Sequence, residues 1–203
     1  MGYYVRVLGT QDPNIHIDEL LESLEASGLS ANIAYAEGEQ PSEWTILEVT
    51  NIEGQALTQI ERNPVIEEEL GKEELDEFRK LIQDFKPTSA VEWLSSYFDR
   101  VKVIYAFQLL YVAFEDNNFE IINSIKTTIW NRTGGIMQAD HEGFTNEAGF
   151  HILWQFADSA EGEWDCAVLD GLDGWKKFTM DLGDKKQRIE FQNGQVPTQA
   201  IIL

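Results

Sequence analysis

Residues 102–139 read KVIYAFQLLYVAFEDNNFEIINSIKTTIWNRTGGIMQA, and this stretch decides the fold that we expect. Its first part, Lys102–Phe114, is rich in Val, Ile, Tyr and Phe, which is typical of a strand covered on both faces. A helix is predicted over Phe119–Trp130, with Asn118 as its cap and Gly134-Gly135 as its end. Ile136–Ala139 is then a short strand. The residues that helical spacing places inward are Phe119, Ile122, Ile125 and Ile129.

The same order of elements occurs near the N-terminus. The elements expected there are a strand, an amphipathic helix and two strands, at Tyr3–Leu8, Ile17–Leu24, Ala31–Ala36 and Trp44–Thr50. In the later copy, Phe150–Phe156 supplies the last strand. The sequence therefore predicts an α+β fold with a mostly antiparallel sheet, built from two β-α-β-β units at about residues 3–50 and 102–156.

A helical connector is expected between the two units, at residues 63–100. Asn63-Pro64 is a typical helix start, because Asn caps helices well and Pro is tolerated in the first turn. Ser89 and Glu92 have the spacing of a capping box, which predicts a further helix start.

An antiparallel hairpin is expected to extend the second unit. Its strands are Trp164–Asp170 and Trp175–Leu182, joined by the Gly-rich turn DGLDG at 170–174. No long linker interrupts the chain, so residues 1–203 are predicted to form a single integrated domain. Within it, residues 1–62 and 101–203 would be pseudo-repeat halves.

The charge of the chain narrows the classes of partner. There are 15 basic and 36 acidic residues, and the net charge is -21. Such a field repels nucleic-acid phosphates and anionic membranes, so we expect neither as a partner, and it attracts cations and basic protein surfaces. The first ten residues lack the apolar core of a signal peptide, and no apolar run is long enough to span a bilayer. These features predict a cytoplasmic protein.

The polar loop Asp140–Glu147 is the most site-like part of the sequence, because it lies between apolar runs and holds one of the three histidines. Imidazole titrates near neutral pH and carboxylates can orient it, so Asp140, His141 and Glu142 are candidate catalytic acid–base residues. The candidate ligand-binding residues are His141, Glu142, Asn146, Glu147, His151 and Trp175. The simpler interpretation is a solvated loop whose polar residues serve turn geometry.

Metal and cysteine chemistry have less support. The ten-residue separation of His141 and His151 matches no zinc spacing, no Gly-rich phosphate-binding fingerprint occurs, and we expect neither metal nor cofactor. Cys166 is the single cysteine, so no intrachain disulfide forms. If Phe150–Phe156 and Trp164–Asp170 pair as a hairpin, strand alternation places Cys166 in the core. Most tryptophans fall on inward positions too, with Trp175 as the expected exception.

Together these features predict a non-enzymatic module that binds a small ligand or acts through regulatory protein interaction. Its partner would be an unidentified small molecule or a basic protein surface. Two alternatives stay open. One is a hydrolase or lyase that uses His141 with Asp140 or Glu142 as its acid–base group, and the other is a purely structural or assembly protein.

Overall fold

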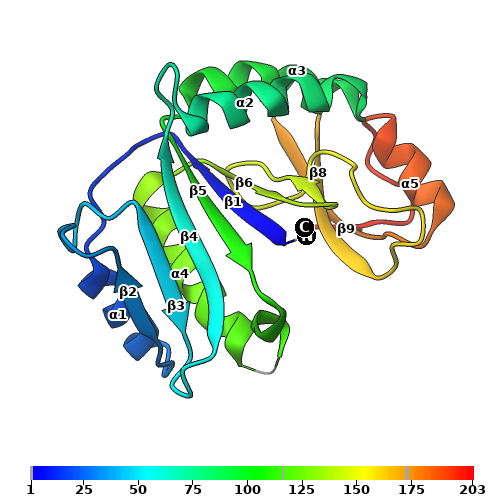
Figure 1. The fold of residues 1–203 in the computed structure, drawn as a ribbon. Coiled ribbons are helices and arrows are strands. Elements are labelled where there is room, and N and C mark those ends of the chain that lie inside the picture. The colour runs from blue at the N-terminus through cyan, green and yellow to red at the C-terminus, as the bar shows by residue number, and fades with distance from the viewer. Residues whose placement is uncertain (1, 116, 172–173) are drawn as a thin grey trace. The chain divides into compact units, whose positions relative to one another are not determined.

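The structure, a computed structural model, describes residues 2–115, 117–171 and 174–203, and it is an α+β fold (Figure 1). The helices are α1 (Ile17–Ala26), α2 (Leu70–Leu81), α3 (Thr88–Tyr97), α4 (Asn118–Thr133) and α5 (Lys185–Gln192). The strands are β1 (Tyr3–Gly9), β2 (Asn32–Tyr35), β3 (Ile46–Thr50), β4 (Ala56–Pro64), β5 (Val103–Leu109), β6 (Ile136–Ala139), β7 (Gly143–Phe144), β8 (Glu163–Leu169), β9 (Trp175–Asp181) and β10 (Ile201–Ile202).

The chain divides into two compact units. The first contains Met1–Lys72 and Val101–Gly135, and the second contains Glu73–Arg100 and Ile136–Leu203. That the whole chain forms a single integrated domain stays a prediction. No helix in the described ranges is both long enough and apolar enough to cross a bilayer.

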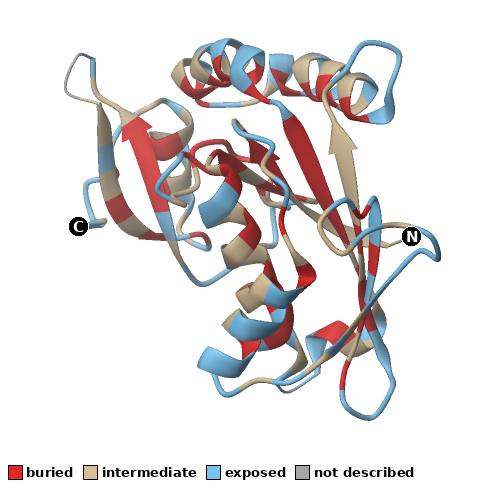
Figure 2. Ribbon diagram, turned by 90° about the vertical axis from the view of Figure 1, so that its left-hand side faces the viewer, coloured by how far each residue is buried: buried red, intermediate tan, exposed pale blue. Residues whose placement is uncertain are grey.

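The first unit is an antiparallel sheet covered on one face by two helices. Its strands follow the order β2-β3-β4-β5-β1, and α1 and α4 pack against each other on one side of them (Figure 1). Leu47, Ile60 and Phe107 stand in register on three neighbouring strands and are fully buried. Buried residues line these strands and one side of each helix (Figure 2). Helical and strand periodicities thus meet in one apolar core.

Strand β4 is the main correction to the predicted order of elements. It occupies Ala56–Pro64, where the sequence predicts a helix start at Asn63-Pro64, and α2 begins only at Leu70. The strand pairs with β3 on one side and β5 on the other. This two-sided pairing outweighs the local capping signal. The helix start predicted from a capping box at Ser89 is also wrong, because α3 begins at Thr88 after Pro87, without a side-chain cap.

The second unit holds the β6–β7 hairpin and a three-stranded antiparallel sheet in the order β10-β9-β8. The predicted β8–β9 hairpin is confirmed, although Leu172 and Asp173 of its turn lie outside the described residues. Helix α5 follows this hairpin, and its Phe191 packs into a buried cluster with Phe178 and Met180. Cys166 belongs to the same cluster, as predicted, and burial raises the pKa of its thiol.

Phe150–Phe156 is not a regular strand, which is a second correction. The segment makes single bridges, and the bridge of His151 to Cys166 is parallel. The His151 N–H donates to the Asp165 carbonyl (3.0 Å), and the Ala167 N–H donates to the His151 carbonyl (2.8 Å). The antiparallel hairpin predicted for this pair is therefore wrong, because His151 meets β8 in the parallel sense, at the edge of β8 that β9 does not occupy. The doubled β-α-β-β order is confirmed as β1-α1-β2-β3 and β5-α4-β6-β7. The last strand of the second copy is, however, β7 and not the predicted Phe150–Phe156.

Candidate functional site

The predicted loop Asp140–Glu147 is a turn, a two-residue strand and a second turn. His141 has a φ of 65°, in the left-handed region, and its side chain is exposed. Asn146 points the other way and is buried; its Oδ1 accepts the N–H groups of Ala148 (3.0 Å) and Phe150 (3.1 Å). Its side-chain oxygen therefore serves turn geometry, and the loop sends its predicted site residues in different directions.

His151 and Glu142 do come together. The Trp164 indole N–H donates to His151 Nδ1 at 2.7 Å, so the neutral ring carries its proton on Nε2. That nitrogen lies 4.0 Å from Glu142 Oε2, too far for a direct hydrogen bond. Phe156 and Trp164 flank the ring at 5.5 and 5.2 Å between centroids. Burial lowers the pKa of His151 to about 4, and the distant carboxylate does not offset it.

This neutral, buried histidine makes folding stability depend on pH. His151 is 12% exposed, and its pKa lies below the value of about 6.5 expected in the unfolded chain. Unfolding therefore takes up a proton between pH 6.5 and 4. As the pH is lowered from 6.5 to 4, we expect the free energy of unfolding to decrease by about 3 kcal/mol because of His151 alone. Urea denaturation at a series of pH values measures it.

The matched variants are His151→Gln and His141→Asn. His151→Gln should flatten the pH dependence between pH 6.5 and 4. His141→Asn should leave it unchanged, because His141 is exposed and Asn tolerates the left-handed backbone of that turn. Equal pH dependence in wild type and His151→Gln would contradict a buried neutral imidazole.

Glu147 and Trp175 lie with residues of α3 and the turn after it. Glu147 Oε1 pairs with Arg100 Nη2 at 3.3 Å, and burial, followed by the Glu147 charge, raises the pKa of Tyr97. The Trp175 ring meets Trp93 edge-on at 5.1 Å, and Trp93 stacks on Tyr97 at 4.7 Å. Trp175 and Trp93 are both half-buried. Glu147 thus contacts Arg100, and Trp175 contacts Trp93.

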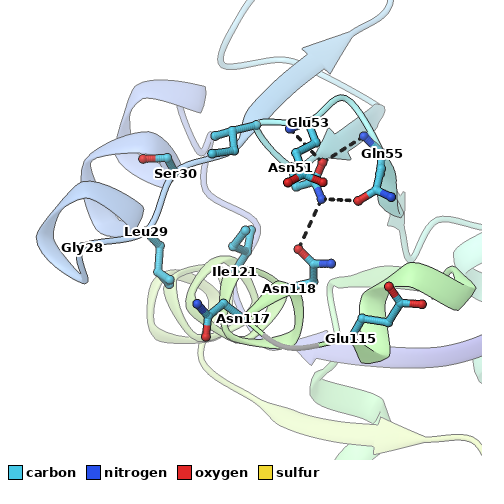
Figure 3. A pocket seen from close by; sticks show the side chains of 11 residues that line it. Gly28, Leu29, Ser30, Asn51, Glu53, Gln55, Glu115, Asn117, Asn118 and Ile121 are labelled. Atoms are coloured by element: carbon cyan, nitrogen blue, oxygen red, sulfur yellow. Dashed lines mark hydrogen bonds between the residues drawn. The ribbon is translucent and has the colours of Figure 1, made fainter.

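A pocket that the sequence analysis did not identify lies in the first unit, with a volume of about 480 Å³. Three segments form it: the chain after α1, the β3–β4 turn and the start of α4 (Figure 3). The residues that line it are Gly28, Leu29, Ser30, Asn51, Ile52, Glu53, Gln55, Glu115, Asn117, Asn118 and Ile121. Side-chain amides and carboxylates dominate this wall, so it favours a polar ligand.

Asn51 holds the pocket wall together. Its Oδ1 accepts the N–H groups of Glu53 (3.1 Å) and Gln55 (2.9 Å), which fixes the β3–β4 turn. Its Nδ2 donates to Gln55 Oε1 at 2.8 Å and to Asn118 Oδ1 at 3.5 Å, so turn and helix are tied across the pocket (Figure 3). Asn118 Nδ2 donates in turn to the Val112 carbonyl at 3.0 Å. The wall is therefore organised before any ligand arrives.

The carboxylates of Glu53 and Glu115 give the pocket its charge. No hydrogen bond or ion pair joins either carboxylate to another side chain in the described ranges. The start of α4 carries the positive end of a helix dipole, equivalent to about half a charge. Two full negative charges exceed it, within a chain of net charge -21. The pocket therefore favours a cation over an anion.

A second hollow of about 480 Å³ lies between α1 and α4 and shares Leu29 with the first. Its wall consists of hydroxyls and amides that bond largely to one another. Thr128 donates to Ser23 at 2.7 Å, and the Ser23 and Ser124 hydroxyls are 3.2 Å apart. These contacts join the two helices, and we assign them a packing role.

Comparison with known protein families, with curated proteins and with solved structures finds nothing that matches the chain. Within the described residues, no group of three or more His, Cys, Asp or Glu side chains is placed to hold a metal ion. The fold and the site define the protein as an α+β protein with an acidic, amide-lined pocket at one end of its sheet.

Proposed function

We propose that the protein is a non-enzymatic, cytoplasmic binding module that takes a small organic cation, such as a basic side chain, in the pocket of the first unit. One observation carries this proposal: the Glu53 and Glu115 carboxylates, which pair with no other side chain in the described part of the chain, stand on a wall that Asn51 has already ordered. The volume of about 480 Å³ lies within the range of small-ligand sites.

A guanidinium group suits this wall better than an ammonium group. It is planar and carries five N–H donors in a fixed fork, which can satisfy a carboxylate and an amide oxygen at the same time. Glu53, Glu115 and the Asn117 amide can bind it, whereas the Asn51 and Asn118 amides already bond to each other and to the chain.

The test is calorimetric titration at low salt with N-acetyl-arginine methylamide, a capped arginine. Wild type should bind it saturably, and Glu53→Gln with Glu115→Gln should raise the Kd about tenfold, through the loss of two charge-assisted contacts. The control is Glu22→Gln with Glu25→Gln, which removes two exposed charges on α1 outside the pocket. It should change the Kd less than twofold. An equal effect of both double variants, or none of either, would contradict the proposal.

The hydrolase or lyase alternative stays a prediction. The geometry lends it little support, because the exposed His141 stands in a left-handed turn, whereas the buried His151 has a pKa too low for a base at neutral pH.

A further inference from the structure

Three aromatic side chains are exposed beside the pocket: Tyr111 (85%), Phe114 (57%) and Phe119 (39%). We call them the aromatic shelf. Residues 111–114 form a 3-10 helix, whose three residues per turn place Tyr111 and Phe114 on one side. The rings of Phe114 and Phe119 stack at 6.4 Å with an angle of 21° between their planes. The shelf therefore consists of one packed pair of rings, Phe114 and Phe119, with Tyr111 on the same side of the 3-10 helix as Phe114.

Helical spacing places Phe119 inward, but the structure exposes it, which corrects that prediction. Ile122, Ile125 and Ile129 of the same helix are buried as predicted. Large aromatic rings supply much of the energy of protein interfaces, and clustered exposed ones commonly mark a binding surface.

Shelf and pocket are parts of one surface. Glu115 follows Phe114 directly and lines the pocket, and Asn118, another lining residue, precedes Phe119. On the opposite wall, Ile52 is 77% exposed. A group seated between Glu53 and Glu115 would therefore bring its neighbouring atoms onto apolar surface.

We propose that the pocket and the aromatic shelf together dock a segment of a partner protein in which an arginine is flanked by large apolar side chains. This inference rests on the proposed function of the pocket. Charge complementarity selects the basic segment, because Glu53 and Glu115 line the pocket and the exposed Glu120 follows Phe119 directly, so that their negative charges balance its positive charge. A second copy of this chain fits poorly, since each copy carries a net charge of -21 and the two repel.

The test compares two capped tripeptides of equal charge, leucine-arginine-leucine and alanine-arginine-alanine, by calorimetric titration. Wild type should bind the leucine peptide about five- to tenfold more tightly, because its apolar side chains bury surface on the shelf. Tyr111→Ser with Phe114→Ser should remove this difference and leave the Kd of the alanine peptide within twofold. Tyr111→Ser alone, at an 85% exposed position, should reduce the difference without disturbing the fold.

The outcomes separate the two proposals. If the peptides bind wild type equally and Glu53→Gln with Glu115→Gln weakens both, the pocket binds cations and the inference about the shelf is overturned. If that pocket variant weakens neither peptide, the proposed function itself fails. A dimer seen by sedimentation that Tyr111→Ser dissociates would assign the shelf to a second copy and also overturn the inference.

Discussion

Gly135→Ala is expected to lower the free energy of unfolding by about 3 to 5 kcal/mol, because two costs act at one position. Gly135 has a φ of 105°, in a region that side chains rarely adopt. A Cβ atom there would stand 2.0 Å from the Leu8 carbonyl oxygen in β1. Backbone cannot rotate away as a side chain can, so the chain between α4 and β6 would have to shift. Urea denaturation of the purified variant measures the change.

Gly162→Ala is the matched control. Gly162 has a similar φ of 101°, and no atom of the described residues lies within 4 Å of its added Cβ. It should lose about 1 to 2 kcal/mol, the cost of the backbone conformation alone. A loss at Gly135 no larger than that at Gly162 would show that the close approach to Leu8 is absent.

Phe144→Ala should lower the free energy of unfolding by about 3 to 5 kcal/mol. Phe144 is fully buried in the short strand β7, and its ring meets Phe78 at 5.4 Å and Phe98 at 5.7 Å between centroids. Truncation removes both ring contacts and leaves a cavity that the neighbouring helices cannot fill. The midpoint of urea denaturation, at an unchanged slope, is the measurement.

Two variants bracket this result. Phe144→Leu keeps most of the volume and should lose less than about 2 kcal/mol. Phe114→Ala makes the same chemical change at a 57% exposed position and should lose about 1 kcal/mol or less. Similar losses at Phe144 and Phe114 would contradict the burial of Phe144.

The repeated order of elements was predictable from the sequence because its signals are local. Ile122, Ile125 and Ile129 recur at helical spacing, and Tyr3–Gly9 has the β-branched and aromatic content of a strand. Strand β4 was not predictable in the same way. Its buried Leu57 and Ile60 lie among polar residues, and only pairing with strands on both sides identifies it.

The predicted site depended on the directions in which the loop side chains point, and these cannot be read from the sequence. Polar residues crowd Asp140–Glu147, yet a left-handed residue turns His141 outward and an Asn-stabilised turn draws Asn146 inward. The pocket fails to appear in the sequence for a related reason. Asn51 and Asn118 are 67 positions apart, and only the packing of α4 beside the β3–β4 turn brings them together.

The most direct test of the account follows the side-chain amide resonances of Asn51, Gln55, Asn117 and Asn118 by nuclear magnetic resonance while N-acetyl-arginine methylamide is added. All four line the proposed site and belong to one wall. We expect saturable shifts in these amides, with Asn146 unchanged. Saturable shifts at Asn146 and along residues 140–147, with the four pocket amides unmoved, would contradict binding in the pocket. They would instead place the binding site in the loop that the sequence predicts.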